Sequence, residues 1–234
     1  MVLSSKECVI GNAKKYLKSF IAATCTLLSF FAVGCANKPS VEAQTKVHSP
    51  SEAVSDWQVA LQYLKEGNKR FIENQGVVRN TNANDRDILK GGQKPFAVII
   101  TCSDSRVPPE IYFDLKLGDI FVIRNAGNIA DSTVLGSIEY AVEHLKAPLV
   151  VVVGHSHCGA VTGAVSGGEY PENLQTIINA ICPAIKGIEN VDEAIHANIN
   201  NVVKHIKENK IVEHVGAKVI GAYYNIESGE VLFK

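Results

Sequence analysis

The chain has 234 residues and a formal net charge of −1, with 46% hydrophobic and 20% charged residues. This composition is typical of a globular protein, and the length suits one ordinary domain with an appended segment. The balanced charge, with no basic stripe interleaved with aromatic side chains, argues against a nucleic-acid partner.

The first part of the chain differs from the rest in composition. Lysines precede an uncharged stretch over residues 19–37, which is apolar in its middle and ends in small residues. A basic start, an apolar core and a small-residue end are typical of a secretory signal. Residues 32–35, AVGC, also resemble the bacterial lipoprotein box, in which the cysteine becomes the lipidated first residue. We therefore expect residues 1–34 to be a signal peptide and Cys35 to carry the lipid.

This segment implies export to the periplasm or the cell envelope, with a lipid anchor as the attachment to the membrane. An uncleaved transmembrane anchor and a plain signal peptide stay open as alternatives, since the uncharged stretch is just long enough to span a bilayer. Residues 35–54 are polar and lack periodicity, which predicts a flexible linker to a domain over residues 55–234. We expect His48 to be a solvated residue of this linker.

Three cysteines remain in the predicted domain, namely Cys102, Cys158 and Cys182. An exported domain tends to oxidise accessible thiols, but an odd number argues against a disulfide framework, and two thiols on a metal would leave one bystander. Cys182 lies between apolar residues, and we expect it to be a buried small hydrophobic residue.

The predicted domain begins with a helical pattern. Ser55 and Gln58 have the spacing of a capping box, and apolar residues recur at helical intervals as far as residue 72. This pattern predicts an N-terminal helical arm. Residues 75–94 are polar and Gly-rich, so we expect them to form a connector.

Strand and helix patterns alternate from residue 95 onward. Apolar runs without polar alternation indicate strands buried on both faces, as in a parallel sheet. These runs cover residues 95–101, 119–123 and 148–154. The helical patterns cover residues 132–145 and 191–207, and a predicted hairpin pairs residues 217–226 with 229–233. The prediction is an α/β fold with a mainly parallel central sheet flanked by helices, an N-terminal helical arm and a C-terminal β-hairpin.

Metal-binding residue types follow two of the predicted strands. Because ligands of open parallel sheets bind at the carboxyl ends of the strands, neighbouring strands would bring Cys102 together with His155 and Cys158. Thiolate and imidazole are ligands that zinc prefers, and three protein ligands with one open position are the catalytic arrangement. His155 and Cys158 are three residues apart and would share a face of a helical turn. His157 would point elsewhere.

Asp104 and Arg106 suggest a catalytic role for this site. Residues two apart on an extended segment project to the same side, so Asp104 would pair with Arg106 and accept a hydrogen bond from metal-bound water. If the pair breaks, Asp104 becomes a fourth ligand and closes the site. The alternative is a structural zinc with four protein ligands, Asp104 included. The ligands lie 53 residues apart in a domain with ample core, which favours the catalytic interpretation.

Four motifs make this chain resemble the β-class carbonic anhydrases. They are CSDSRV at 102–107, RNAGN at 124–128, SIEYAV at 137–142 and GHSHCGAV at 154–161, and the resemblance runs from Ser55 to the C-terminus. The resemblance implies Zn²⁺ held by Cys102, His155 and Cys158, with Asp104 and Arg106 as a gating dyad. It also implies a homodimer as the minimal unit, with the N-terminal helix embracing the partner, and larger assemblies of such dimers.

The active site resembles the plant-type members of this family. Gln93, Phe121 and Tyr140 match pocket positions of that group, in which the glutamine binds substrate across the dimer. His144 matches a proposed proton-shuttle position, and an exposed helix histidine without a role is the alternative.

A regulatory site of some bacterial members is matched only in part. Arg124 and Tyr224 match it, but Ile99 stands where the bicarbonate-regulated members carry a tryptophan. The resemblance therefore favours a constitutively open site.

The function implied is the zinc-dependent, reversible hydration of CO₂ to bicarbonate and a proton by zinc-bound hydroxide. One alternative keeps the same fold and zinc site but acts on CS₂ or COS. Another is a non-catalytic, zinc-holding module of the envelope, which the presence of both Asp104 and Arg106 disfavours.

Overall fold

The computed structural model describes residues 48–49, 52–76 and 83–234. The expected signal peptide, Cys35 and most of the expected linker lie outside these residues. Within the described ranges, no helix is both long enough and apolar enough to cross a membrane.

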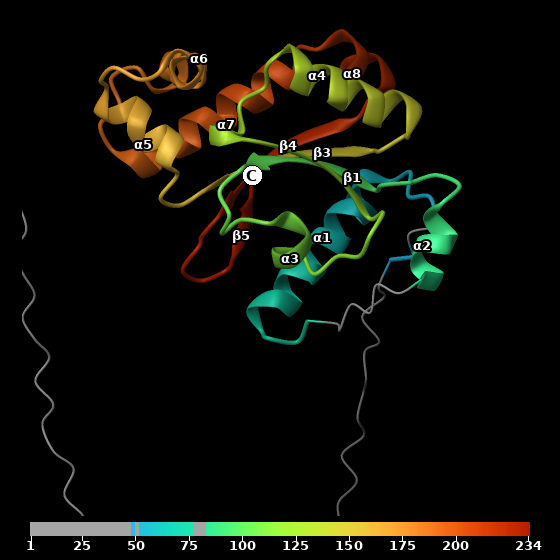
Figure 1. Ribbon diagram of the computed structural model, residues 1–234. Coiled ribbons are helices and arrows are strands. Elements are labelled where there is room, and N and C mark those ends of the chain that lie inside the picture. The colour runs from blue at the N-terminus through green and yellow to red at the C-terminus, as the bar shows by residue number, and fades with distance from the viewer. Residues whose placement is uncertain (1–47, 50–51, 77–82) are drawn as a thin grey trace, which may run out of the picture. The chain divides into compact units, whose positions relative to one another are not determined.

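A single five-stranded sheet in the order β2-β1-β3-β4-β5 organises the domain (Figure 1). The strands are β1 (Ala97–Cys102), β2 (Ile120–Asn125), β3 (Leu149–His155), β4 (Lys218–Tyr224) and β5 (Val231–Phe233). The first four run parallel, and only β5 is antiparallel to its neighbour β4. Every residue of β1 and β3 is buried, which explains their unbroken apolar runs. The predicted α/β fold, its mainly parallel sheet and the C-terminal hairpin are confirmed.

Helices cover both faces of this sheet (Figure 1). On one face lie α4 (Ser132–Glu139), α7 (Val191–Lys207) and α8 (Lys210–Val215), and on the other lie α1 (Trp57–Ile72) and α3 (Pro109–Tyr112). The remaining helices are α2 (Ala83–Leu89), α5 (Gly159–Ser166) and α6 (Glu172–Ile181). Shorter turns are the 3₁₀ turns η1 (Ala126–Asn128) and η3 (Cys182–Ile185) and the π-helical turn η2 (Tyr140–His144).

Several boundaries differ from the sequence prediction. Helix α1 begins at Trp57 because the carboxylate of Asp56, not the hydroxyl of Ser55, accepts the backbone N–H of Gln58. The expected connector 75–94 contains α2, and the helix expected over 132–145 is divided into α4 and η2. Cys182 begins η3 and is only partly buried.

Polar contacts fasten α1 to the domain. The side-chain amide of Asn68 donates to the carbonyl oxygens of Tyr112 (2.9 Å) and Gly229 (2.8 Å), and its oxygen accepts the N–H of Val231 (2.9 Å). One buried side chain thus joins α1 to α3 and to the hairpin that ends the sheet.

The expectation that His48 is solvated is wrong, since only 4% of this residue is exposed. Its ring contacts those of Tyr63 and Phe96, with centroids 5.3 and 5.0 Å away. Nδ1 lies 2.8 Å from Asp119 Oδ1, and Nε2 lies 3.1 Å from the carbonyl oxygen of Glu52, so both ring nitrogens of this buried imidazole have hydrogen-bond partners.

The substitution His48→Ala is expected to lower the free energy of unfolding by about 2 kcal/mol, because it removes the hydrogen-bond partner of the buried Asp119 Oδ1. Urea unfolding at neutral pH measures the difference. His205→Ala, at an exposed position of α7, is the control and should change stability by less than about 0.5 kcal/mol. Equal stability of His48→Ala and the wild type would mean that this buried contact does not stabilise the protein in solution.

Candidate metal centre

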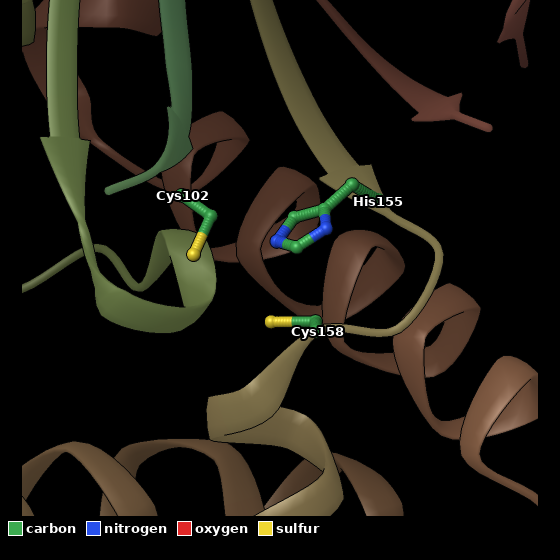
Figure 2. Close-up of side chains that lie close together, drawn as sticks. All are labelled: Cys102, His155 and Cys158. Carbon is green, nitrogen blue, oxygen red and sulfur yellow. The ribbon is translucent and has the colours of Figure 1, made fainter. Parts of the chain in front are cut away.

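Three metal-ligating side chains meet at the carboxyl edge of the sheet. Cys102 is the last residue of β1 and His155 the last of β3, and these two strands are parallel neighbours. Cys158 directly precedes α5 and ends the turn that leaves β3. Figure 2 shows the three side chains pointing toward one another, and their ligand atoms all lie within 4.8 Å of one another.

The surroundings of this group fit a metal ion. All three residues are buried, with at most 5% exposed. His155 Nδ1 donates to the carbonyl oxygen of Ser156 at 2.9 Å, which leaves Nε2 with a lone pair facing the group. This Nε2 is buried and has no partner among the described residues, a costly arrangement unless a ligand is bound. Two sulfurs, one imidazole nitrogen and a fourth, open position match the donor preference of catalytic zinc.

The two thiols shift each other's pKa in opposite directions. A hydrogen bond from the thiol of Cys158 lowers the pKa of Cys102 to about 4, and the same bond raises the pKa of Cys158. Burial of the thiol also raises the pKa of Cys158. The pair thus favours the deprotonated sulfur on Cys102, and a thiolate is the form of cysteine that binds a metal ion.

Asp104 and Arg106 form a two-pronged ion pair beside the group. Asp104 Oδ1 accepts from the backbone N–H and from Nε of Arg106, both at 2.9 Å, and Oδ2 accepts from Nη2 at 2.7 Å. These bonds hold the pKa of the Asp104 carboxyl well below its usual range. The structure therefore has the predicted dyad formed, with Asp104 outside the Cys102–His155–Cys158 group.

Arg124 holds the loop between the first ligand and the dyad. Its Nε donates to the carbonyl oxygen of Cys102 at 3.0 Å, and its Nη2 donates to that of Asp104 at 2.6 Å. The sequence analysis noted this arginine only as part of a regulatory site. The parallel register, which pairs Thr101 with Arg124 across β1 and β2, is what places it here, and no local sequence signal reveals that pairing.

His157 lies outside the ligand group, as predicted. Its backbone has a φ of 57° and its side chain is 67% exposed, with Nε2 3.7 Å from Glu227. Its carbonyl oxygen accepts a hydrogen bond from Arg106 Nη2 at 3.4 Å. The main chain of His157 thus supports the dyad, while its imidazole faces away.

The expected pocket residues lie toward the other end of the sheet. Gln93 is exposed in the loop that precedes β1. Phe121 pairs with Val98, four strand residues before Cys102, which corresponds to about 13 Å along the strand. The ring of Tyr140 lies 6.2 Å from that of Phe121.

His144 belongs to the same region. Its ring centroid lies 5.5 Å from that of Tyr140, its side chain is 64% exposed, and Nε2 is 3.8 Å from Glu143. Within one chain, the structure does not bring the four residues expected from the plant-type resemblance together with the metal-ligand group.

Comparison with known proteins identifies the family. Residues 97–231 match the family model described as carbonic anhydrase. The fold superposes on one of two tetrameric β-carbonic anhydrases from the ascomycete Sordaria macrospora with a TM-score of 0.61 and 28% identity, covering 75% of this chain and 96% of that one. The chain belongs to the β-carbonic anhydrase family.

Two curated mycobacterial carbonic anhydrases share much of its sequence. Carbonic anhydrase 2 of Mycobacterium tuberculosis is 37% identical over 189 residues, which cover 75% of this chain and 91% of the relative. The carbonic anhydrase of Mycolicibacterium smegmatis is 38% identical over 195 residues, which cover 77% and 93%. β-Carbonic anhydrases are zinc enzymes, and Cys102, His155 and Cys158 form the group that fits zinc here.

Replacement of Cys158 by serine is expected to reduce the zinc content from about one ion per chain to a small fraction of that value, because zinc binds thiolate far better than a neutral hydroxyl. Elemental analysis of the purified β-carbonic anhydrase measures this directly. Cys182→Ser is the matched control, since Cys182 lies outside the group, and it should retain full zinc. Full zinc in the Cys158→Ser protein would place the metal elsewhere.

Proposed function

We propose that this chain catalyses the reversible hydration of CO₂ to bicarbonate and a proton, with zinc held by Cys102, His155 and Cys158. One observation carries the proposal. The buried group with its unpartnered His155 Nε2 lies next to a carboxylate, that of Asp104, whose orientation is set by Arg106. A site that only stored zinc would have no use for an aligned acceptor at its edge.

Zinc bound at this group would act as a Lewis acid that lowers the pKa of a water molecule to about 7. The residues of the chain tune and direct that chemistry. Two thiolates carry enough negative charge to neutralise Zn²⁺, which acidifies water less than three neutral imidazoles would and shifts activity toward alkaline pH.

Asp104 is an acceptor throughout the working pH range, because Arg106 holds its pKa well below the usual value. It can therefore accept a hydrogen bond from the attacking water and orient the oxygen lone pair toward CO₂. Since the lowered pKa belongs to the folded state, the ion pair favours folding above the unfolded carboxyl pKa of about 3.9 and is lost only in strong acid.

Asp104→Asn is expected to retain zinc and to lower kcat/KM for CO₂ hydration by about 10- to 100-fold, because the amide can donate toward the water instead of accepting from it. Stopped-flow hydration assays, with zinc measured on the same samples, test this. Glu208→Gln, an exposed carboxylate at the end of α7, controls for the loss of a surface charge. A wild-type rate in Asp104→Asn would refute the role of the dyad.

We further propose that the substrate pocket is completed by a second copy of the chain. Gln93, Phe121 and Tyr140 gather toward the amino end of β1 and β2, away from the metal ligands of their own chain. β2 is an edge strand whose Ile120, Phe121, Val122 and Ile123 are only partly buried. An apolar edge of this kind favours pairing with another chain, and the Sordaria relative is described as tetrameric. These features support a homodimer or a larger homo-oligomer.

Mixing two inactive variants tests this arrangement. Chains carrying Cys102→Ser lack a metal ligand, and chains carrying Gln93→Ala with Phe121→Ala lack the pocket. If each site combines ligands of one copy with the pocket of the other, a mixed dimer contains one intact site, and random mixing should restore roughly a quarter of the wild-type activity.

The control mixes either variant with itself through the same unfolding and refolding cycle, and it should remain inactive. Absence of recovery in the mixed sample, with mixed dimers verified by two affinity tags, would mean that each chain builds its own pocket.

His144 is the residue we propose as the proton shuttle. Its imidazole is exposed and adjacent to Tyr140 on the pocket side, and histidine changes its charge near neutral pH. His144→Ala should slow turnover in dilute buffer and recover in concentrated imidazole. A deficit that imidazole does not relieve would contradict this role.

We also propose that residues 1–34 direct export and that Cys35 is lipidated, which would place the enzyme in the periplasm or the cell envelope. Lysines, an uncharged stretch and the AVGC sequence at 32–35 support this. Cys35→Ala should move the protein from the membrane fraction to the soluble fraction of cells, whereas Cys25→Ala should leave it in the membrane fraction. A Cys35→Ala protein that stays with the membrane would favour an uncleaved anchor.

A further inference from the structure

A backbone N–H from a remote turn reaches the first metal ligand. Cys102 Sγ accepts the N–H of Gly127 at 3.4 Å, and this bond contributes to the lowered pKa of the thiol. A hydrogen bond to a thiolate withdraws charge from the sulfur and fixes its direction, and partners of this kind tune both metal affinity and reactivity.

The turn that supplies this N–H depends on an unusual backbone. Gly127 has φ 74° and ψ 14° within η1, a left-handed conformation that glycine adopts without steric cost. A Cβ at this position would lie 2.7 Å from Ile181 Cδ1 and 3.2 Å from the Cβ of Ala160. The Asn125 side chain ties the two ends of this turn through two 2.9 Å hydrogen bonds with Ile129, but neither bond involves a peptide group of Gly127. Because glycine is free to rotate, the peptides on either side of its Cα need a restraint of their own.

Asn198 provides that restraint. Its Nδ2 donates to the carbonyl oxygen of Gly127 at 2.9 Å from the buried face of α7. This bond holds the peptide on the carboxyl side of Gly127, while the peptide on the amino side presents its N–H to the Cys102 sulfur.

The setting of Asn198 argues that it does more than stabilise the fold. It is 1% exposed, and its neighbours on the same face of α7 are apolar, among them Ile195, Ile199 and Val202. Its Oδ1 is buried and has no partner among the described residues. A buried amide whose oxygen has no hydrogen-bond partner lowers the free energy of unfolding relative to an apolar residue. We therefore attribute the presence of Asn198 to the hydrogen bond that it donates to Gly127.

We propose that Asn198 is a positioning residue for the metal-bound thiolate of Cys102, acting through the peptides of Gly127. It touches neither the metal nor the substrate. The proposal rests on the proposed zinc site, but its test does not require turnover.

The test uses protein in which Co²⁺ replaces zinc, because the thiolate-to-cobalt charge-transfer band reports the electron density on sulfur. Asn198→Ala removes the donor. The band should move to longer wavelength, and zinc should be lost to a chelator about 10- to 100-fold faster than from the wild type. Val202→Ala, one turn further along the same face, is the control for a cavity and should leave both readouts unchanged even where it lowers the melting temperature.

Asn198→Ser is the second variant if the alanine protein folds poorly, since a serine hydroxyl can bond to the carbonyl of its own helix but is too short to replace the amide. An unshifted band and an unchanged rate of zinc loss in a folded Asn198 variant would overturn the proposal. Equal effects in Val202→Ala would overturn it too. A wild-type protein that holds metal but hydrates no CO₂ would count against the proposed function and leave this inference standing.

Discussion

The parallel pairing of β1 with β3 is the constraint on which the site depends. Thr101 lies opposite Val153 in this register, so Cys102 and His155 emerge at the same edge although 53 residues separate them. Gly154, the residue before His155 in β3, has no side chain, and this lets α7 pack close to the strand. A Cβ at this position would lie 2.6 Å from Ile199 Cδ1. That close approach of α7 also brings Asn198, the residue before Ile199, to the turn at Gly127. The packing of α7 against Gly154 therefore positions both the end of β3 and the turn that donates to the Cys102 sulfur.

Hydrogen bonds to and from main-chain groups orient the residues of the metal site. Arg124 holds the carbonyl oxygens of Cys102 and Asp104, and Gly127 donates to the Cys102 sulfur. The carbonyl oxygen of Ser156 fixes the tautomer of His155. Ser156 is itself held near the end of β4, because its N–H donates to the carbonyl oxygen of Tyr224 and its hydroxyl oxygen accepts the N–H of Ile226. Such bonds are strong in a buried, weakly polar setting. They restrain the backbone that carries Cys102 and Asp104 and the ring of His155.

Local patterns in the sequence predicted what depends on local physics. Unbroken apolar runs indicate the strands, and metal-ligating residue types at two strand ends indicate the metal group. The prediction of Ser55 as the cap of α1 is wrong by one residue, because Asp56 also suits an N-cap position and its carboxylate accepts the N–H of Gln58. The short helix α2 lacks an apolar face of its own, which is why a polar connector was expected there.

Long-range partners are what the sequence could not reveal. His48 belongs to a polar stretch that carries no sign of burial, and its partner Asp119 is 71 residues away. Asn198 is also 71 residues from Gly127. In both cases a side chain acquires its role from the tertiary fold alone. The structural role of Arg124 could not be predicted for the same reason, because its contacts follow from the register between β1 and β2.

The metal ligands and the proposed pocket residues lie at opposite ends of the strands. Metal ligands occupy the carboxyl end, whereas Phe121 and Gln93 lie toward the amino end, so under the proposal above each chain supplies the ligands of one site and the pocket of another. In the proposed dimer, a twofold axis beside β2 runs the two edge strands in opposite directions. The amino end of one β2 then lies beside the carboxyl end of the other. This symmetry would bring Phe121 of the partner subunit toward Cys102 in both sites. It would also explain why β2, which pairs only with β1 among the described strands, is apolar along its outer edge.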